Sequence, residues 1–160
     1  MKLLFVILLT IASINVSAQT DSRIFYSQLM VVFSDLDKNF EFLKGDLKDK
    51  EGSDTLFESH TNLEGTKDNT ILASSGKYVY QAMINDSTSY EGSEFILNAW
   101  KEKLTKTLAD SFFKLEKNSH SDNDKRVDGY QCSSEKITVF ILRHQSDDGW
   151  YWINLVIKEK

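Results

Sequence analysis

The residues with the strongest catalytic and metal-binding chemistry are one cysteine and three histidines, Cys132, His60, His120 and His144. A zinc site needs ligands at close spacing, such as two histidines on one helix face. The three histidines are far apart in the sequence, so their spacing predicts no metal site. A catalytic thiolate needs a nearby base and some exposure. Cys132 lies in a predicted strand, and a lone cysteine is usually buried. A Cys132–His144 nucleophile would therefore require both side chains to be exposed and close together.

The carboxylates form no recognisable constellation either. The acidic stretch at residues 122–128 departs from a calcium loop, because Arg126 occupies a ligand position and Ser133 replaces the bidentate glutamate. No phosphate-binding glycine loop, dinucleotide fingerprint or serine-hydrolase elbow is present. Glu58, Glu64 and Glu116 could pair as acid and base, but no spacing selects them. The sequence thus points away from an enzyme and implies no cofactor, and a hydrolase with an unrecognised site remains an alternative.

The most informative segment is a C-terminal hairpin of predicted strands 136–144 and 150–158. Its loop contains Asp148-Gly149, which is typical of a tight turn. With a two- or four-residue loop, one face carries Phe140, Leu142 and His144 with Tyr151, Ile153, Leu155 and Ile157. The opposite face carries Ile137, Val139, Ile141 and Arg143 with Trp150, Trp152, Asn154 and Val156. Neither face shows the polar alternation of a strand with one wet side.

We predict that the first of these faces lies under the helices and that the second is a binding surface, because large exposed apolar patches usually mark one. The predicted contact residues are Trp150, Trp152, Arg143, Ile141 and Val139. The alternative is a hairpin in the middle of the sheet, covered on both faces. A loop of three or five residues would exchange the partners.

The helices and strands that position the predicted contact residues can be read from the spacing of apolar residues. Steps of three and four between apolar residues indicate helices over 22–44 and 92–109. Residues rich in Thr, Val, Ile, Phe and Tyr predict further strands over 55–63, 70–75, 77–84, 112–117 and 127–133. Residues 46–52 read as a solvated linker, and no internal repeat is visible at a fixed period. We therefore expect an α+β fold of order α-β-β-β-α-β-β-β-β, whose antiparallel sheet of about six to seven strands carries two helices on one face.

The first 18 residues have the pattern of a cleavable export signal. Lys2 precedes an apolar run, and Val16-Ser17-Ala18 offers small residues for cleavage. Residues 19–160 are then expected to form a single domain, in the periplasm or outside the cell, with no transmembrane segment after cleavage. The net charge of −5 argues against a nucleic-acid partner, and one cysteine allows no internal disulfide.

The order of the predicted helices and strands resembles that of other proteins. Phe42-Leu43-Lys44-Gly45 after an amphipathic helix, short strands, a lysine-rich second helix and a final hairpin resemble small secreted bacterial proteins that are uncharacterised. Their layout is similar to the helix-flanked sheet of type III secretion chaperones. The resemblance spans most of residues 22–158 at the level of element order, and no catalytic residue comes with it.

Together these patterns predict a secreted or periplasmic, non-enzymatic interaction module that binds a polypeptide or forms a homodimer. The alternative is a protein that binds a sugar, a lipid or a cell-wall fragment through Tyr78, Tyr80 and Trp150. That alternative requires a pocket of roughly 300 Å³ or more.

Overall fold

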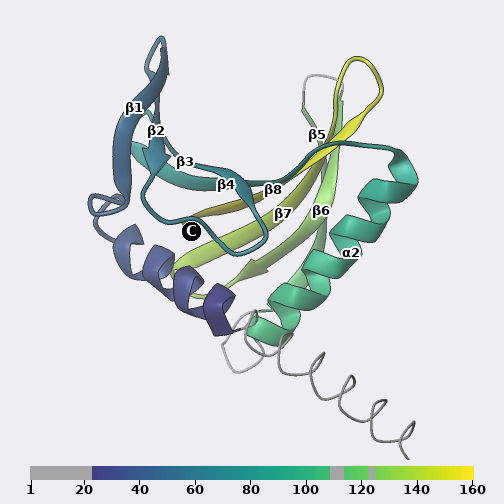
Figure 1. Cartoon of the computed structure of the whole chain (residues 1–160), viewed down its shortest axis with the longest axis horizontal. Coiled ribbons are helices and arrows are strands. Elements are labelled where there is room, and N and C mark those ends of the chain that lie inside the picture. The colour runs from purple at the N-terminus through teal and green to yellow at the C-terminus, as the bar shows by residue number, and fades with distance from the viewer. Residues whose placement is uncertain (1–22, 109–113, 123–124) are drawn as a thin grey trace, which may run out of the picture.

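The computed structural model describes residues 23–108, 114–122 and 125–160, and the predicted export signal lies outside them. They form an antiparallel sheet of eight strands with two helices on one side (Figure 1). The first helix covers residues 23–36 and the second, α2, spans Tyr90–Thr107. The strands are β1 (Lys44–Glu51), β2 (Asp54–Ser59), β3 (Lys67–Ser74), β4 (Lys77–Thr88), β5 (Lys114–Asp122), β6 (Lys125–Ser133), β7 (Ile137–Gln145) and β8 (Tyr151–Glu159). None of the described helices is long and apolar enough to cross a membrane.

The topology repeats although the sequence does not. A helix is followed by the meander β1–β4, and α2 is followed by the meander β5–β8. The two meanders join through their last strands, because the order across the sheet is β1-β2-β3-β4-β8-β7-β6-β5. All neighbouring strands are antiparallel, including the central pair β4 and β8. The predicted α+β class and antiparallel sheet are therefore confirmed.

The hydrophobic core lies between the helices and one face of the sheet. Directly paired residues share a face, and one such row runs through Ile71, Tyr80, Ile157 and Val139, all fully buried. The helices contribute residues at steps of three and four, as the sequence predicted. These buried helix residues are Phe25, Leu29, Val32, Leu97, Trp100 and Leu104.

The first helix ends at residue 36, so the helix predicted over 22–44 is too long. The chain turns at Asn39 and Phe40, which have φ angles of 55° and 56°. The Asp35 carboxylate stabilises this turn by accepting hydrogen bonds from the backbone N–H groups of Phe42 and Leu43, at 2.9 and 3.0 Å. The apolar spacing of a helix continues in the sequence beyond residue 36, because Phe40 and Leu43 are also buried in the core although they lie in the turn.

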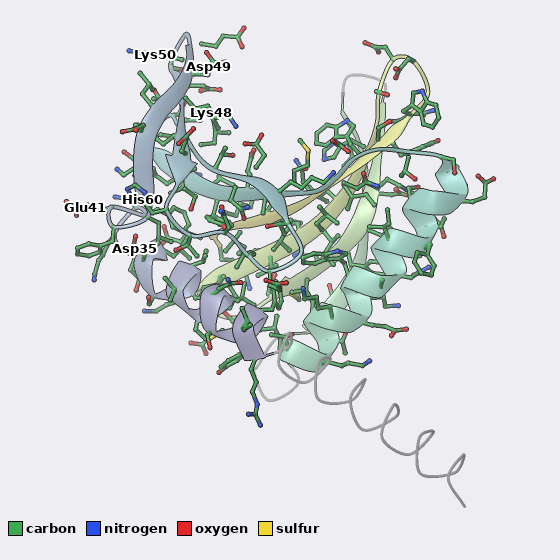
Figure 2. The ribbon with its side chains drawn as sticks, in the orientation of Figure 1. Asp35, Glu41, Lys48, Asp49, Lys50 and His60 are labelled. Atoms are coloured by element: carbon green, nitrogen blue, oxygen red, sulfur yellow. The ribbon has the colours of Figure 1, made fainter. Side chains whose placement is uncertain are left out.

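The segment predicted as a linker, residues 46–52, is instead most of β1, and it raises the sheet to eight strands. β1 is an edge strand that pairs with β2 alone. Figure 2 shows Lys48, Asp49 and Lys50 along it, and the side chains of this strand are largely exposed. A strand that buries almost nothing has no hydrophobic alternation, so its sequence resembles that of a loop. The residues between the strands predicted over 112–117 and 127–133 likewise belong mostly to strands, because β5 ends at Asp122 and β6 begins at Lys125.

Gly129 marks a close approach between the backbones of β6 and β7. A Cβ atom at this position would lie 1.8 Å from the carbonyl oxygen of Ile141 on β7. Glycine inside a strand often marks such an approach. The β6–β7 pairing therefore requires glycine here.

We predict that Gly129→Ala lowers the free energy of unfolding by about 2–4 kcal/mol, because the backbone of β6 must move away from β7. The control Gly52→Ala changes a glycine with φ +58° and no atom within 4 Å of the new Cβ. It is expected to cost only about 1 kcal/mol, for the left-handed backbone alone. Chemical denaturation of both variants measures the difference, and equal losses would contradict the close-approach argument.

Candidate ligand-binding face

The C-terminal hairpin forms as predicted, but its register exchanges the faces. β7 and β8 are joined by a five-residue loop, residues 146–150, and Gln145 pairs with Tyr151. His144 is then opposite Trp152, and Ile141 is opposite Leu155. A shift of one residue moves every side chain of a strand to the other face. The face assignment made with an even loop is therefore wrong.

The five predicted contact residues do not share one surface. Val139 and Ile141 have no exposed area and belong to the core under the helices. Arg143 lies on the same side of the sheet and is 3% exposed. Trp152 lies on the opposite side, and Trp150 stands in the hairpin loop with half of its area exposed. Only the two tryptophans thus remain accessible as predicted contacts.

The side of the sheet away from both described helices carries many apolar side chains, and we call it the open face. Its side chains follow from the register, since residues directly paired to one another share a face. Several rows of half-buried apolar side chains alternate with polar ones such as Gln81 and Asn154. The apolar members are Leu56, Leu72, Val79, Met83, Phe140, Leu142, Trp152 and Val156, with the more deeply buried Val127.

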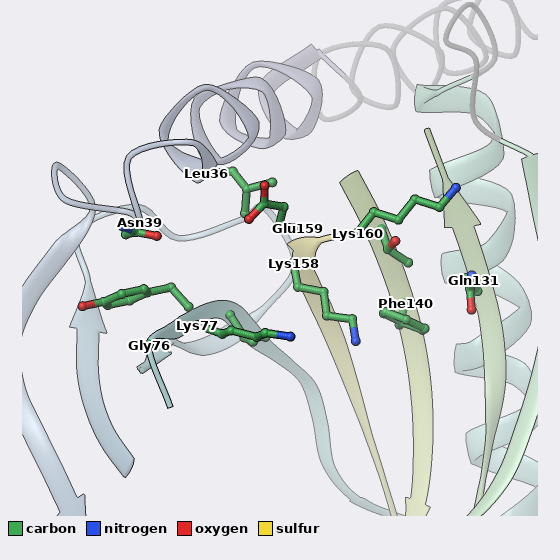
Figure 3. A pocket seen from close by; sticks show the side chains of 12 residues that line it. Leu36, Asn39, Gly76, Lys77, Gln131, Phe140, Lys158, Glu159 and Lys160 are labelled. Atoms are coloured by element: carbon green, nitrogen blue, oxygen red, sulfur yellow. The ribbon is translucent and has the colours of Figure 1, made fainter. Parts of the chain in front are cut away.

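A hollow of about 370 Å³ lies where the open face meets the ends of β4 and β8 (Figure 3). Its floor is formed by Val79, Phe140 and Thr138 of the open face, and Tyr78 and the end of the first helix complete the wall. Three lysines line it: Lys77, Lys158 and Lys160. The Lys158 ammonium lies 5.2 Å from the centre of the Phe140 ring.

At the other end of the open face, an aromatic pair forms a flat surface. The rings of His144 and Trp152 stack with their centres 3.9 Å apart and their planes 9° from parallel. The open face therefore runs from a lysine-lined hollow at one end to a stacked imidazole and indole at the other. Between these ends, aliphatic side chains alternate with the polar side chains of Gln81 and Asn154.

Arg143 holds α2 against the sheet rather than facing a ligand. Its guanidinium donates two hydrogen bonds to Asp128, at 2.8 and 2.7 Å, and one to Glu94 at 2.7 Å. It also donates to the Ser93 hydroxyl at 3.1 Å, and the Tyr90 ring lies 4.6 Å away. The hydrogen bonds with Asp128 raise the pKa of Arg143 above its ordinary value. This arrangement satisfies a buried charge and fixes the start of α2.

The structure excludes a Cys132–His144 nucleophile. Cys132 pairs with Val139 and faces the helices, whereas His144 lies beside Trp152 on the open face. Burial raises the pKa of the Cys132 thiol to about 12, so the thiol stays protonated at neutral pH.

The other titratable candidates are also dispersed. Glu58 lies on β2 and Glu116 on β5, towards opposite ends of the strand order, while Glu64 is in the loop before β3. His60 is exposed at the end of β2, and the side chain of His120 is outside the described part. Among the described residues no group of three or more His, Cys, Asp or Glu side chains could hold a metal ion. The acidic stretch at 122–128 lies partly outside these residues.

The hollow and its lysines were missed by sequence reasoning. The signal that could have found them was the odd loop length, which brings Phe140 and Leu142 together with Trp152 and Lys158 on one face. Comparisons of this chain with known protein families, curated proteins and solved structures find no match.

We predict that Asp128→Ala lowers the free energy of unfolding by about 3–5 kcal/mol, because it leaves a buried guanidinium without its main partner. Glu94→Ala is the matched control. The Glu94 side chain is 44% exposed, so its loss is expected to cost about 1 kcal/mol or less. Replacing both charges in Asp128→Leu/Arg143→Met should leave a more stable protein than Asp128→Ala alone. Urea denaturation tests this order, and equal losses for Asp128→Ala and Glu94→Ala would contradict it.

Cys132 provides a second test of the core. We expect iodoacetamide at pH 8 to alkylate the folded protein at least a hundredfold more slowly than the urea-unfolded protein, because both burial and the raised pKa deplete the exposed thiolate. Mass spectrometry of timed samples measures the rates. Alkylation of the folded protein at the unfolded rate would mean that the β6 strand is not buried as described.

Proposed function

We propose that this protein is an exported, non-catalytic binding module that holds its ligand on the open face. The observation that carries the proposal is a sheet face covered by neither described helix, on which apolar side chains extend from the hollow to the His144–Trp152 stack. An antiparallel sheet with one solvated face normally carries polar residues there. An apolar patch of this kind usually marks a site of interaction.

The edges of the sheet support a ligand on the face rather than an added strand. The edge strands are β1 and β5, and both are rich in charged and polar residues, with sequences KGDLKDKE and KLEKNSHSD. Charged side chains on an edge oppose pairing with another chain. The inner strands have neighbours on both sides, so their backbone groups are engaged within the sheet. Contacts on the open face must therefore come from side chains.

The hollow favours a small ligand over a polypeptide as the occupant. Its volume of about 370 Å³ falls in the range of small-molecule sites. Of the three residues named for the small-ligand alternative, Tyr78 lines the hollow, Tyr80 is fully buried in the core, and Trp150 is not among the lining residues. A polypeptide partner remains the second candidate, because the open face extends well beyond the hollow.

Site-specific photo-crosslinking in the producing cell tests the proposal. A benzophenone amino acid is placed at Leu142, in the middle of the open face, and separately at Phe95 as the control. Phe95 is 77% exposed on α2, on the opposite side of the molecule. We expect irradiation to give a defined adduct from position 142 and none from position 95, because the ligand is held over the open face. Intact-mass spectrometry identifies the adduct as a small molecule or a polypeptide.

Two outcomes would contradict the proposal. The first is an adduct from position 95 with none from position 142, which would move the binding surface to the helices. The second is the absence of any adduct at position 142 while the variant protein folds normally by circular dichroism.

A further inference from the structure

We infer that the ligand is an amphipathic anion of the fatty-acid class, with its carboxylate at the lysines of the hollow and its acyl chain along the open face. This inference rests on the proposed function and deepens it, because it names the ligand class of the same surface. The geometry that carries it is the juxtaposition of Lys77 and Lys158 with Val79 and Phe140 at one end of an apolar track.

The charge of the hollow is opposite to the charge of the chain. The protein carries a net charge of −5, yet the hollow is lined by three lysines and one glutamate, Glu159. Within the described part, the lysines that form ion pairs are others: Lys48, Lys67, Lys106 and Lys136. Lys77 and Lys158 are in none of these pairs, so their ammonium groups are available to a ligand. Unneutralised cations beside an apolar wall favour an anion that also carries an apolar part.

The register places the two lysines together on the open face. Val79 is directly opposite Lys158, and Lys77 lies two residues before Val79 on the same strand and therefore on the same face. Phe140 lies under the Lys158 ammonium. One carboxylate between Lys77 and Lys158 would thus have an apolar surface directly beside it.

The apolar track beyond the lysines has the length of an acyl chain. From Lys158 to Trp152 the strand β8 extends about 20 Å, at roughly 3.3 Å per residue. Val156 on β8 and Leu142 on β7 line this path, the polar Asn154 lies between Val156 and Trp152, and the His144–Trp152 stack is at the far end. An extended acyl chain needs no hydrogen bonds and can lie along such a path.

An extended peptide fits this surface less well. Its backbone N–H and C=O groups lose water on docking and need partners. On the open face these partners would be side chains at scattered positions such as Gln81 and Asn154, because the backbone of the inner strands is engaged within the sheet. A hydrocarbon chain carries no such requirement, and its burial is favourable in proportion to the apolar area removed from water.

Isothermal titration calorimetry of the purified protein with three probes tests the inference. The probes are myristate, its methyl ester and acetate, which separate the charged head from the chain. We expect myristate to bind at least tenfold more tightly than the methyl ester, and acetate to show no measurable binding. Backbone NMR shifts should place the myristate contacts on β4, β7 and β8.

The variant Lys77→Gln/Lys158→Gln removes both charges without shortening the side chains much. We expect its affinity for myristate to fall at least tenfold, to the level of the methyl ester, with methyl ester binding unchanged. The control Lys101→Gln/Lys106→Gln removes two lysines of α2, which lie on the helix side of the sheet and outside the hollow. It is expected to bind both probes like the original protein, and thermal unfolding confirms that each variant is folded.

Different results would overturn the fatty-acid site and the proposed binding module. Equal affinity for myristate and its methyl ester, or unchanged myristate affinity in Lys77→Gln/Lys158→Gln, overturns the anion site while the binding module stands. No binding of either acyl probe overturns the fatty-acid class. A polypeptide adduct from position 142 together with no acyl binding assigns the open face to a protein partner instead.

Discussion

The antiparallel pairing of β4 with β8 is the constraint on which the rest of the molecule depends. Each of these strands ends a unit made of one helix and a four-stranded meander. Antiparallel neighbours are related locally by a two-fold axis perpendicular to the sheet. Such an axis maps each face of the sheet onto itself, so two units that each place their helix on the same face of their meander bring both helices to one side (Figure 1). The face that neither described helix covers therefore follows from how the two units join.

The two helices are held against the sheet by different interactions. The first helix is anchored by apolar contacts, including Phe25 edge-to-face with Trp100 of α2 at 5.6 Å. The start of α2 is anchored by a buried charge, because Arg143 on β7 binds Asp128 on β6 and also Ser93 and Glu94 on the helix. Removing one partner of a buried ion pair is costly because it leaves a buried charge uncompensated. Displacing the start of α2 would break the hydrogen bonds that Ser93 and Glu94 accept from Arg143.

The sequence predicted the helices and strands whose buried apolar residues recur at a regular spacing. The predictions were wrong where a strand buries almost nothing or where buried residues lie outside a regular element. α2 and the β7–β8 hairpin have strong periodicity, and both were found within a few residues. β1 was missed because an exposed edge strand carries charges at almost every position. The first helix was extended too far because Phe40 and Leu43 are buried from a turn rather than from a helix.

The faces of the hairpin were assigned wrongly for a different reason. The loop between β7 and β8 has an odd number of residues, and this decides which side chains share a face. The Asp148-Gly149 pair suggested an even loop, but the backbone N–H and the hydroxyl of Ser146 both donate hydrogen bonds to the Trp150 carbonyl oxygen and close a loop of five residues. The odd loop length sends Ile141 and Arg143 to the helices and brings Phe140 and Leu142 to the open face. Neither face of this hairpin is polar, so the hydrophobic pattern could not select the register. Both faces of the hairpin are apolar, and for this reason the sequence did not reveal the register. One apolar face packs in the core, and the other forms the proposed binding surface.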